Sequence, residues 1–530
     1  MSAGATIIRR LEALKGIRRP VEKVWEDCFN ASYPHRASGF GSTIDADQAQ
    51  RKKAEILDVV TTDAVRTLAS NIMSGLTPAN SRWFALDVGQ RESQDERRWL
   101  DDAAQVLFEN IHASNFDAEA FEAIIDAVCA GWFCLYIDEN TEKGGLYFEQ
   151  WPLASVYAAA STQSGIIDTI YREFELTAEQ AVATYGNAVS GKVKECAEKK
   201  PDEKFTFVLE IKPRKDGKPG AKMAKNLPFS SITVEKNTKQ VVRESGYHEF
   251  PCAVPRWLRV PGTPYAVGPL SDALPEANML NELKRMHLAS AEMTIAGMWI
   301  AEDDGVLNPR TIKVGPRKVI VANSVDSMKP LQPAGSWQLA QEEIRQSQAA
   351  IRKILMADQL QPQDGPAMTA TEVHVRVNLI RQLLGPVYGR LNAEYLQRVI
   401  ERCFGLAYRA GVFTPPPQSL AGRDFSIRYI SPLARAQKLE DVTAVERFAA
   451  NLGQLAQISP DVLDLVDFEE MARITGDGLG VPMKVMRSEQ DVAELREQRA
   501  KQQQQQQQQM MLAQVAQQAA PDMIKQAMGQ

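Results

Sequence analysis

The segment that comes closest to a nucleotide-binding motif is GNAVSGKV, Gly186 to Val193. Its glycine and lysine spacing is that of a phosphate-binding loop, in which a Ser or Thr after the lysine holds magnesium. Val193 stands where that hydroxyl is needed, and a helical pattern rather than a strand precedes the segment. We therefore expect no phosphate site here.

The side chains that most often perform catalysis or bind metals are scattered along the chain. The HExxH, GxSxG and Rossmann glycine motifs do not occur. The acidic pairs Asp101–Asp102 and Asp303–Asp304 lie in polar sequence, where charged side chains usually face solvent. We expect no enzyme, no metal site and no cofactor. The isolated residues are His35, His112, His248, His287 and His374, and Cys28, Cys129, Cys134, Cys196, Cys252 and Cys403.

Length and charge narrow the classes of function. The 530 residues suffice for about two to four domains, and 44% hydrophobic content is typical of a globular protein. A net charge of −6 excludes the basic excess with which proteins grip duplex DNA tightly. Cysteines without CxxC pairs fit a reducing compartment. The most apolar run, Ala127 to Ile137, is too short for a membrane span, and the start is helical rather than a signal peptide.

The first third of the chain is predicted to be mainly helical. Apolar residues at helical spacing predict a long segment from Asp45 to Gly75, and a further helical region runs from about Asp95 to Ala130. Between them, the segment TPANSRWFAL supplies a turn and an aromatic pair. We expect that pair, Trp83 and Phe84, to pack in the core rather than to bind a ligand.

Residues 132 to 260 are predicted to form a mixed, mostly antiparallel β region. Its strand patterns are WFCLYIDEN, GGLYFEQW, IDTIYREFEL and KFTFVLEIKPR. One helix, Thr177 to Tyr185, interrupts them, and Thr177 with Gln180 fits a capping box. The basic segment Lys212 to Lys225 is interpreted as a solvated loop, with a contact to DNA or a partner protein as the alternative.

Two helices then bracket a small β module. Ser271 to Ala296 is the first helix, Met298 to Pro333 has β pattern and turns, and Ser336 begins the second helix. The second helix has a narrow apolar stripe, which suits a helix packed against few neighbours. The stripe consists of Trp337, Ala340, Ile344, Ser347, Ile351 and Ile354.

The remaining chain is a polar loop, Ala357 to Met368, followed by a helix from Thr369 to Gly411, the strand pattern FSIRYIS and further helices from about 434 to 486. The Thr369–Gly411 helix would have about 42 residues, or roughly 63 Å. Gly385 and Pro386 interrupt it near its middle, where proline removes a backbone donor. Eight glutamines at 502 to 509 favour either disorder or one extended helix.

This order of elements resembles the head-to-tail connector, or portal protein, of short-tailed (podovirus-type) bacteriophages. The matching segments are NIMSGLTPANSRWFAL, GPLSDALPEANMLNELKRM, TATEVHVRVNLIRQLLGPVYGRLNAEYLQRVIERCF and YISPLARAQ, which together span residues 71 to 437. In two places the chain departs from what we expect of the family: YAVGP replaces a more glycine-rich turn, and the glutamine tail matches no family pattern.

The resemblance implies an α+β, mainly α portal fold with named parts. The wing would be 1–265, and it would also include the kinked long helix and return strand of 369–431. The stem would be helices 266–297 and 336–357. The clip would be 298–335, the channel loop 358–368, the crown 432–487, and the C-terminal barrel helix or tail 488–530.

The resemblance also implies a function and partners. About twelve copies would form a ring at one capsid vertex of the virion, assembled in the host cytoplasm, through which double-stranded DNA is packaged and later ejected. The partners would be the large subunit of the terminase, the head–tail adaptor and tail proteins, and the major capsid and scaffolding proteins. The DNA would pass without sequence-specific contacts, and no membrane is involved. The alternative is a helical scaffold or adaptor of the virion without a DNA channel.

Four sets of residues follow from this assignment. Gln359, Gln361, Gln363 and Asp364 would face DNA in the channel loop. Gly385 and Pro386 would kink the long helix by more than about 20°; two separate helices meeting at a turn are the alternative. Arg310, Lys313, Arg317 and Lys318 would contact a partner at the clip or be ordinary surface charge. Met510, Met511, Leu512 and Val515 would hold a barrel together.

Overall fold

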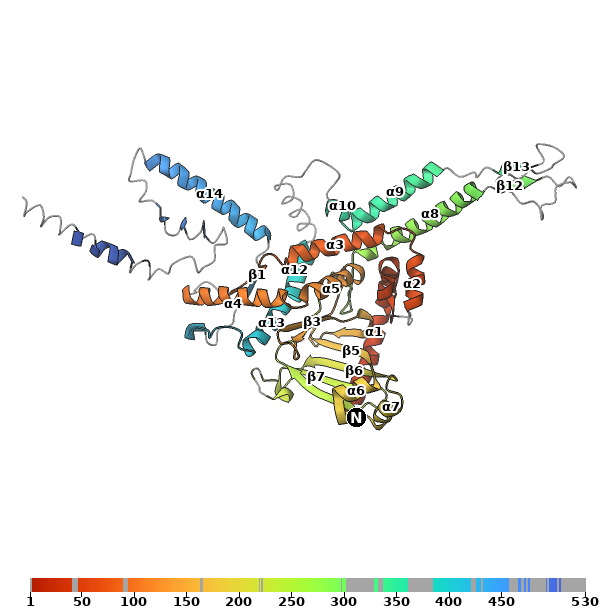
Figure 1. Ribbon diagram of the computed structural model, residues 1–530, viewed down its shortest axis with the longest axis horizontal. Coiled ribbons are helices and arrows are strands. Elements are labelled where there is room, and N and C mark those ends of the chain that lie inside the picture. Colours follow the sequence, from red (N-terminus) through yellow and green to blue (C-terminus); the bar gives the residue numbers. More distant parts are fainter. Residues whose placement is uncertain are drawn as a thin grey trace, which may run out of the picture. The chain divides into compact units, whose positions relative to one another are not determined.

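The computed structural model describes residues 2–40, 46–88, 94–162, 165–218, 220, 223–296, 298–301, 328–331, 337–360, 385–420, 426–429 and 432–456, with short stretches between 466 and 506. The chain divides into two compact units. The first comprises residues 1–83 and 107–412, and the second comprises residues 84–106 and 413–530. Figure 1 labels many of their helices and strands.

The first unit begins with helices α1 (Ala3–Ser32), α2 (Ala46–Ala54) and α3 (Val60–Leu76). The prediction of one helical segment from Asp45 to Gly75 is wrong, because residues 55–59 separate α2 from α3. The Asp58 side chain accepts a hydrogen bond from Val60 N at 2.9 Å, which satisfies a free donor at the start of α3. A carboxylate in this position therefore starts a new helix.

The second predicted helical region also contains two helices. α4 (Gln94–His112) and α5 (Phe116–Ala130) are separated by a turn, and the Ser114 hydroxyl accepts from Phe116 N at 3.2 Å. Gly131 ends α5 with φ +85°, a conformation that glycine adopts without strain. Trp83 and Phe84 are 2% and 0% exposed, so their predicted place in the core is confirmed.

Two antiparallel sheets follow, within the region that was predicted to be mostly antiparallel β. The four predicted patterns correspond to the strands at 135–139, 146–150, 169–177 and 204–213, whereas the strands at 156–159, 229–235 and 241–247 were not predicted. One sheet has the order β4-β5-β6-β7-β8 and the other the order β3-β2-β9. The five strands are β4 (Val156–Ala159), β5 (Thr169–Thr177), β6 (Lys204–Pro213), β7 (Phe229–Glu235) and β8 (Val241–Tyr247). The three are β3 (Leu146–Gln150), β2 (Leu135–Glu139) and β9 (Cys252–Ala253). A short pair, β10 (Leu258–Arg259) and β11 (Ala266–Val267), comes next.

Helix α6 (Ala178–Tyr185) has the predicted capping box between Thr177 and Gln180. A second helix, α7 (Gly191–Lys199), was not predicted. The segment that resembles a phosphate-binding loop forms the start of α7, and Val193 is fully buried in the cluster that contains Phe205 and Phe207. The apolar residue that breaks the motif is therefore a core residue. In Figure 1, α6 and α7 lie at the end of the five-stranded sheet.

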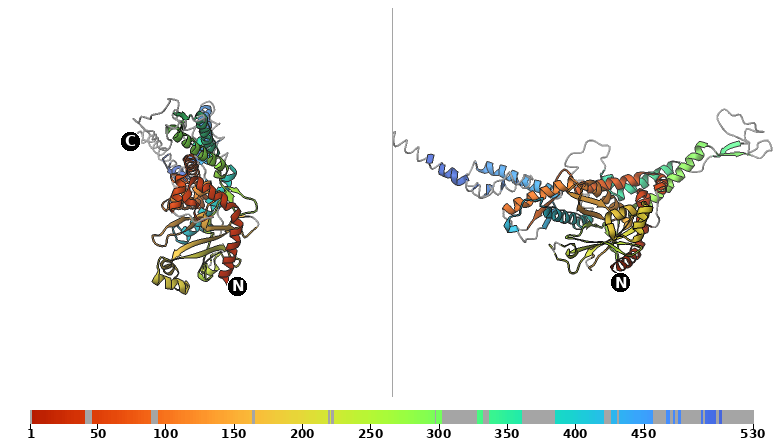
Figure 2. Two further views of the ribbon diagram at one scale, coloured as in Figure 1. Left: turned by 90° about the vertical axis from the view of Figure 1, so that its right-hand side faces the viewer. Right: turned by 60° about the horizontal axis from the view of Figure 1, so that its bottom comes forward.

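Helix α1 packs its apolar face on this sheet. Ile7, Leu11 and Leu14 form one buried cluster with side chains of β4, β5, β6 and β7. Figure 2 shows α1 along the sheet in both views. The basic segment from Lys212 begins as the last residues of β6 and continues as turns with a short 3₁₀ turn, Ala224–Asn226, so most of its described part is the predicted loop.

The predicted pair of helices around a β module is confirmed. Helix α8 (Leu270–Ala296) packs along helix α9 (Trp337–Ile354), and β12 (Met298–Ala301) pairs antiparallel with β13 (Met328–Leu331) between them (Figures 1 and 2). We call α8, α9, β12 and β13 the arm. A short helix, α10 (Ala357–Leu360), follows α9.

The predicted long helix is described from Gly385 onward. It consists of α12 (Gly385–Leu391), a π turn (Asn392–Leu396) and α13 (Gln397–Arg409), and it ends before Gly411, whose φ is +70°. The π turn was not predicted. Residues 369–384, and with them the bend expected at Gly385–Pro386, lie outside the described part.

The second unit contains a two-stranded antiparallel sheet, β1 (Phe84–Asp87) with β14 (Ser426–Tyr429), and helix α14 (Pro432–Ala456). The FSIRYIS strand and the helix after it are as predicted. Residues 495–502 are helical, whereas most of the glutamine tract lies outside the described residues. Within the described ranges, no helix is long and apolar enough to cross a membrane, and no cluster of metal-binding side chains occurs.

Candidate functional site

Few of the predicted site residues fall in the described part of the chain. Gln359 lies in α10, and Gly385 and Pro386 are the first two residues of α12. The others lie outside the described residues: Gln361, Gln363 and Asp364 of the loop, Arg310, Lys313, Arg317 and Lys318 of the clip, and Met510, Met511, Leu512 and Val515 of the tail. The structure therefore describes the elements that carry these sets rather than the sets themselves.

The arm has one buried seam and exposes apolar side chains elsewhere. On α9, Ile344, Ser347 and Ile351 are buried, as the predicted narrow stripe requires, and Ala340 and Ile354 are half-buried. Leu355, which follows α9, is also fully buried and was not part of the predicted stripe.

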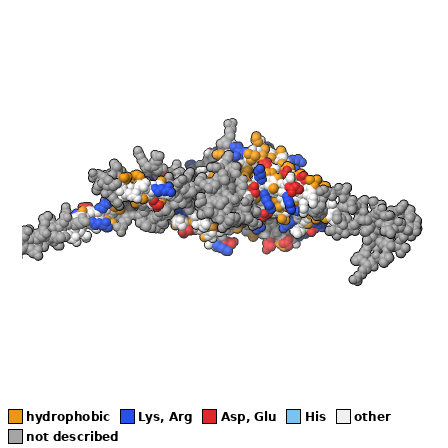
Figure 3. Space-filling view, turned by 90° about the horizontal axis from the view of Figure 1, so that it is seen from above, with side chains coloured by type: hydrophobic (Ala, Val, Ile, Leu, Met, Phe, Trp, Pro, Cys, Tyr) orange, Lys and Arg blue, Asp and Glu red, His pale blue; other side chains and the backbone are white. Residues whose placement is uncertain are grey.

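Two methionines one heptad apart, Met279 and Met286, leave 44% and 54% of their surface exposed on α8. They lie on the same side of the helix, because seven residues make nearly two turns. Figure 3, which views the molecule from above, shows hydrophobic side chains exposed among charged ones on the described part of the upper surface. An apolar stripe on a long helix is typical of a surface that packs against another chain.

The beginning of α8 is fixed by close backbone contact. A Cβ on Gly268 would lie 2.4 Å from the Val128 carbonyl oxygen, and one on Gly131 would lie 2.0 Å from the Val267 carbonyl carbon. Only glycine allows the backbones to approach this closely. Gly268 is the glycine of the YAVGP segment, so a single glycine at this position meets the packing requirement.

An aromatic cluster supports the same junction. The Trp25 indole N–H donates to the Ala266 carbonyl at 3.0 Å, and the Trp25, Trp132 and Tyr265 ring centroids lie 5.3–5.4 Å apart. All three side chains are at most 1% exposed. The base of the arm is therefore held by α1, α5 and the strand before α8.

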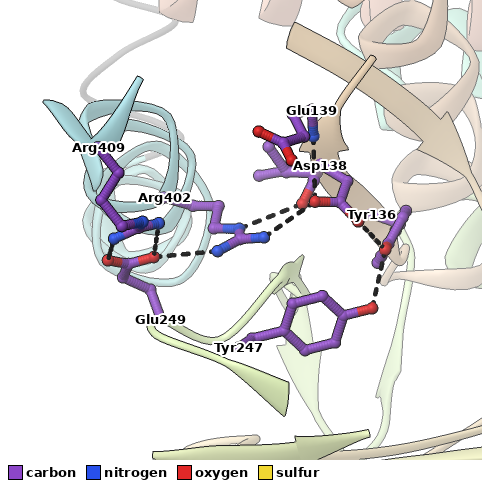
Figure 4. A network of polar contacts seen from close by, with 8 residues as sticks. Tyr136, Asp138, Glu139, Tyr247, Glu249, Arg402 and Arg409 are labelled. Atoms are coloured by element: carbon purple, nitrogen blue, oxygen red, sulfur yellow. Dashed lines mark hydrogen bonds and ion pairs between the residues drawn. The ribbon is translucent and has the colours of Figure 1, made fainter. Parts of the chain in front are cut away.

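The helix that ends at Arg409 is attached to the β region by arginines (Figure 4). Arg402, 3% exposed, donates to Asp138 at 3.1 Å and to Glu249 at 3.0 Å. Arg409 makes a two-pronged pair with Glu249 at 2.5 and 2.8 Å. Tyr136 donates to Asp138 at 2.5 Å and contacts Tyr247, which extends the network across the sheets. Planar guanidinium groups suit such bidentate pairs.

The same helix is attached a second time through its π turn. Glu394 accepts from the Arg256 backbone N–H and Nε, both at 3.1 Å, and also contacts its Nη2. Arg390 donates to the Trp257 carbonyl at 2.7 Å. A π turn adds one residue to a helical turn and so changes the direction of the side chains around it. We infer that this turn directs the Glu394 side chain toward the β region, as Arg390, Arg402 and Arg409 are directed.

Burial and charge set the protonation of this network. Burial alone would raise the pKa of Glu249, but hydrogen bonds from Arg409 and the charges of Arg409 and Arg402 lower that pKa below its usual value. Burial and the charge of Arg409 lower the pKa of His248. Burial raises the pKa of the Tyr136 hydroxyl, so this group stays protonated and donates. The network thus holds a fixed charge arrangement at neutral pH.

A cavity of about 620 Å³ lies beside the network. Three of the arginines that line it, Arg172, Arg402 and Arg409, are ion-paired with carboxylates and so attach neighbouring segments to one another. Burial raises the pKa of the Cys28 thiol to about 12, so this thiol is inert at neutral pH.

The sequence did not predict the residues that attach this helix to the β region, because their partners are far away in sequence. Residues 390, 394, 402 and 409 are charged and recur at roughly helical intervals, which is a visible signal. Arg18, 1% exposed, donates to the Leu153, Ala154 and Val156 carbonyls at 2.7–3.0 Å. On the sequence it is one more charge in a basic helix, so nothing marks it as buried.

Comparison with known protein families gives one model that covers most of the chain. The model is that of the bacteriophage head to tail connecting proteins, and it matches residues 4–486. The arm, the helix that ends at Arg409 and most of both units fall within this range, whereas the end of the second unit, which includes the glutamine tract, lies beyond it.

Two phage proteins are similar to the chain over nearly its whole length. A probable portal protein of Bordetella phage BPP-1 is 29% identical over 503 residues, which is 90% of this chain and 86% of that protein. The portal protein of Salmonella phage epsilon15 is 28% identical over 516 residues, 94% of this chain and 91% of that protein.

Proposed function

The chain belongs to the bacteriophage head-to-tail connecting proteins and is a portal protein of the phage capsid, and we propose that about twelve copies form its ring. Membership in this family confirms the resemblance drawn from the segments between residues 71 and 437. It implies an oligomeric ring associated with capsid and tail. In our proposal, double-stranded DNA enters the capsid through the ring and later leaves by the same route.

The observation that carries this proposal is the arm. Within the family match, two packed helices carry a β pair and expose the apolar stripe of Met279 and Met286. In a closed ring each arm meets a neighbouring arm on either side, so such a stripe would be buried. A monomer would leave these methionines in water.

The parts of the ring follow from the position of the arm in the chain. Helices 266–297 and 336–357 would be the stem, and residues 298–335 would be the clip at its end. The clip would contact the terminase large subunit during packaging and the head–tail adaptor afterwards, through Arg310, Lys313, Arg317 and Lys318. The wing, 1–265 with 369–431, would face the capsid and scaffolding proteins, and residues 432–487 would form the crown.

The charge of the chain suits passage of DNA. A channel that neutralised phosphates at every step would release counterions and hold the duplex, whereas this chain has a net charge of −6. The proposed channel loop, 358–368, offers Gln359, Gln361 and Gln363 as uncharged polar contacts beside Asp364. These contacts would guide the duplex without binding it tightly.

Two further elements complete the proposal. A bend of more than about 20° at Gly385–Pro386 would turn the long helix along the channel wall. Residues 488–530 would form a barrel of parallel tails, held by Met510, Met511, Leu512 and Val515 and by hydrogen bonds between glutamine amides. One such helix alone has little apolar surface to bury, so the barrel would need many copies.

Deleting Gln361–Gly365 tests the channel loop. We expect rings of normal mass that package less DNA or lose it, because the deletion removes contacts inside the channel and not between subunits. A Gly/Ser replacement of equal length separates the effect of side chains from that of loop length. Normal head filling by the deletion variant would contradict the proposed role of the loop.

The alternative function is a helical scaffold or adaptor that binds other virion proteins without forming a channel. Negative-stain images of the purified protein distinguish the two. Rings with an open centre support the channel, and filled or irregular particles support the scaffold.

A further inference from the structure

One buried carboxylate joins the arm to the rest of the first unit. Asp58 lies in the linker 55–59 between α2 and α3, and it is 8% exposed. Its Oδ1 accepts from Val60 N at 2.9 Å, which starts α3. This contact leaves the other oxygen, Oδ2, available for different donors.

Both arm helices supply those donors. The Gln348 side chain of α9 donates to Asp58 Oδ2 at 2.7 Å, and the Lys284 ammonium of α8 lies 3.4 Å from the same oxygen. The Asp58 and Lys284 side chains are 5% and 30% exposed, so water only partly screens the pair. A single side chain therefore contacts α3, α8 and α9.

A second residue of α8 holds the linker itself. The Asn281 side chain accepts from Leu57 N at 2.8 Å and donates to the Glu55 carbonyl at 3.1 Å. Asn281 and Lys284 are three residues apart, so they lie on one face of α8. The linker, which has no regular structure of its own, is thus bound to α8 directly before Asp58.

We propose that Asp58 is a positioning residue that sets the direction of the arm relative to α3. The buried seam of the arm is apolar, and apolar contacts resist sliding and tilting less specifically than hydrogen bonds do. The three contacts of Asp58 fix the two arm helices to the same helix start. A shift of the arm would break at least one of them.

Asp58 contacts the arm near its base, so a small change in the angle of the arm there moves the far end of the arm by a larger distance. From Lys284 to the end of α8 at Ala296 the helix runs roughly 18 Å. A tilt of about 10° at the base would therefore move that end by about 3 Å, and β12 follows directly. This inference concerns the direction of the arm, and it holds whether or not the arm surrounds DNA.

The rival explanation is that Asp58 only caps α3. The variant Asp58→Asn separates the two, because asparagine is as good a cap as aspartate but carries no charge for Lys284. Amide hydrogen exchange of the full-length assembled protein, measured by mass spectrometry, gives the exchange rates of the arm and of α3 separately.

We expect Asp58→Asn and Lys284→Met each to raise exchange in α8 beyond Asn281 and in the exposed turns of α9 by about tenfold, the effect of losing one charged hydrogen bond. Lys284→Met should also raise exchange at the start of α3, because the coupling acts in both directions. The double variant should exceed neither single variant by more than about twofold, since both remove the same pair.

The proposal would be overturned if the arm of the Asp58→Asn variant exchanged its amide hydrogens at the wild-type rate. Fully additive effects on the exchange rate in the double variant would also overturn it. Glu282→Gln is the matched control, because Glu282 is an exposed carboxylate of α8 whose ion pair is with Arg285. Gln348→Ala tests the contact from α9 and gives an independent readout if Asp58→Asn fails to fold. It should raise exchange both in α9 and at the start of α3, and an unchanged start of α3 would count against the coupling.

Discussion

Three buried arginines hold the first unit together at points where hydrophobic packing alone would leave freedom. Arg18, Arg256 and Arg402 are at most 3% exposed, and each donates to several oxygens. A buried charge is costly unless it is fully paired, so each arginine specifies a particular arrangement of its partners. These single side chains therefore determine which backbone segments contact one another.

Replacing Arg402 by alanine should destabilise the protein strongly. Asp138 and Glu249, whose side chains are 30% and 29% exposed, would each lose one partner, and the loss of such charged hydrogen bonds typically costs about 1.5–3 kcal/mol. Arg398→Ala is the control, since Arg398 lies on the same helix but is 33% exposed and pairs at 3.5 Å with nearby Glu401. It should change stability by less than about 0.5 kcal/mol. Thermal unfolding followed by circular dichroism measures both, and equal effects would contradict the special role of Arg402.

The same network should make stability depend on pH below about 4.5. The pKa of Glu249 is lowered in the folded state, so its contribution is complete above the ordinary value of 4.5 and is lost as the pH falls through the lower folded value. Glu249→Gln should lower the melting temperature at pH 7 and reduce the further loss in acid. Glu142→Gln, at an exposed turn position, should leave the profile unchanged. A wild-type acid profile in Glu249→Gln would exclude Glu249 as a titrating group.

At the scale of elements, the arm depends on where α8 begins. The close approach of Gly268 to the end of α5 and the aromatic cluster around Trp25 determine that point. Apolar periodicity along α8 determines only which face is turned inward. A shift of one residue at the start would rotate every later contact by about 100°.

Gly268→Ala should therefore destabilise the protein by about 1–3 kcal/mol, the usual cost of overpacking. The new methyl group would lie 2.4 Å from the Val128 carbonyl oxygen. Gly75→Ala is the matched control, because Gly75 lies in α3 with no atom within 4 Å of the added carbon, and alanine is the better helix former. That control should be neutral or slightly stabilising in chemical denaturation. If Gly268→Ala left the free energy of unfolding unchanged, the backbone at this junction would be able to move apart and accommodate the methyl group.

At the scale of the whole molecule, ring formation should depend on the exposed stripe of α8. Met279→Asp with Met286→Asp places charges in the proposed interface between subunits, where burying the exposed half of each methionine would contribute about 1 kcal/mol. We expect loss of the ring by mass photometry, with secondary structure preserved in circular dichroism. Met223→Asp is the control, since Met223 is 65% exposed and lies outside the arm. Intact rings from the double variant would place the subunit interface elsewhere.

The mass of the wild-type assembly tests the proposal most directly. We expect a closed ring, because a heterologous interface that closes on itself forms one. The proposed copy number gives this particle the mass of about twelve subunits. A protein that stays monomeric under all assembly conditions would contradict the proposed channel.

Sequence alone determined the elements whose signal is local. Alternating apolar residues predicted β2, β3, β5 and β6, helical spacing predicted α8 and α9, and the capping box predicted the start of α6. The order of these elements, with a few short segments, was enough to identify the family. Each of these signals lies within a few residues of the structure that it predicts.

Only the tertiary structure decided the contacts between distant residues. Nothing near Asp58 in the sequence marks it as the partner of Lys284 and Gln348, and nothing near Arg402 points to Glu249. Val193 resembled a failed magnesium ligand until its burial against β6 explained it. The physical reason is that a charge or an apolar side chain gains its role from whatever packs against it, and folding brings the partners of Asp58 and Arg402 from more than a hundred residues away.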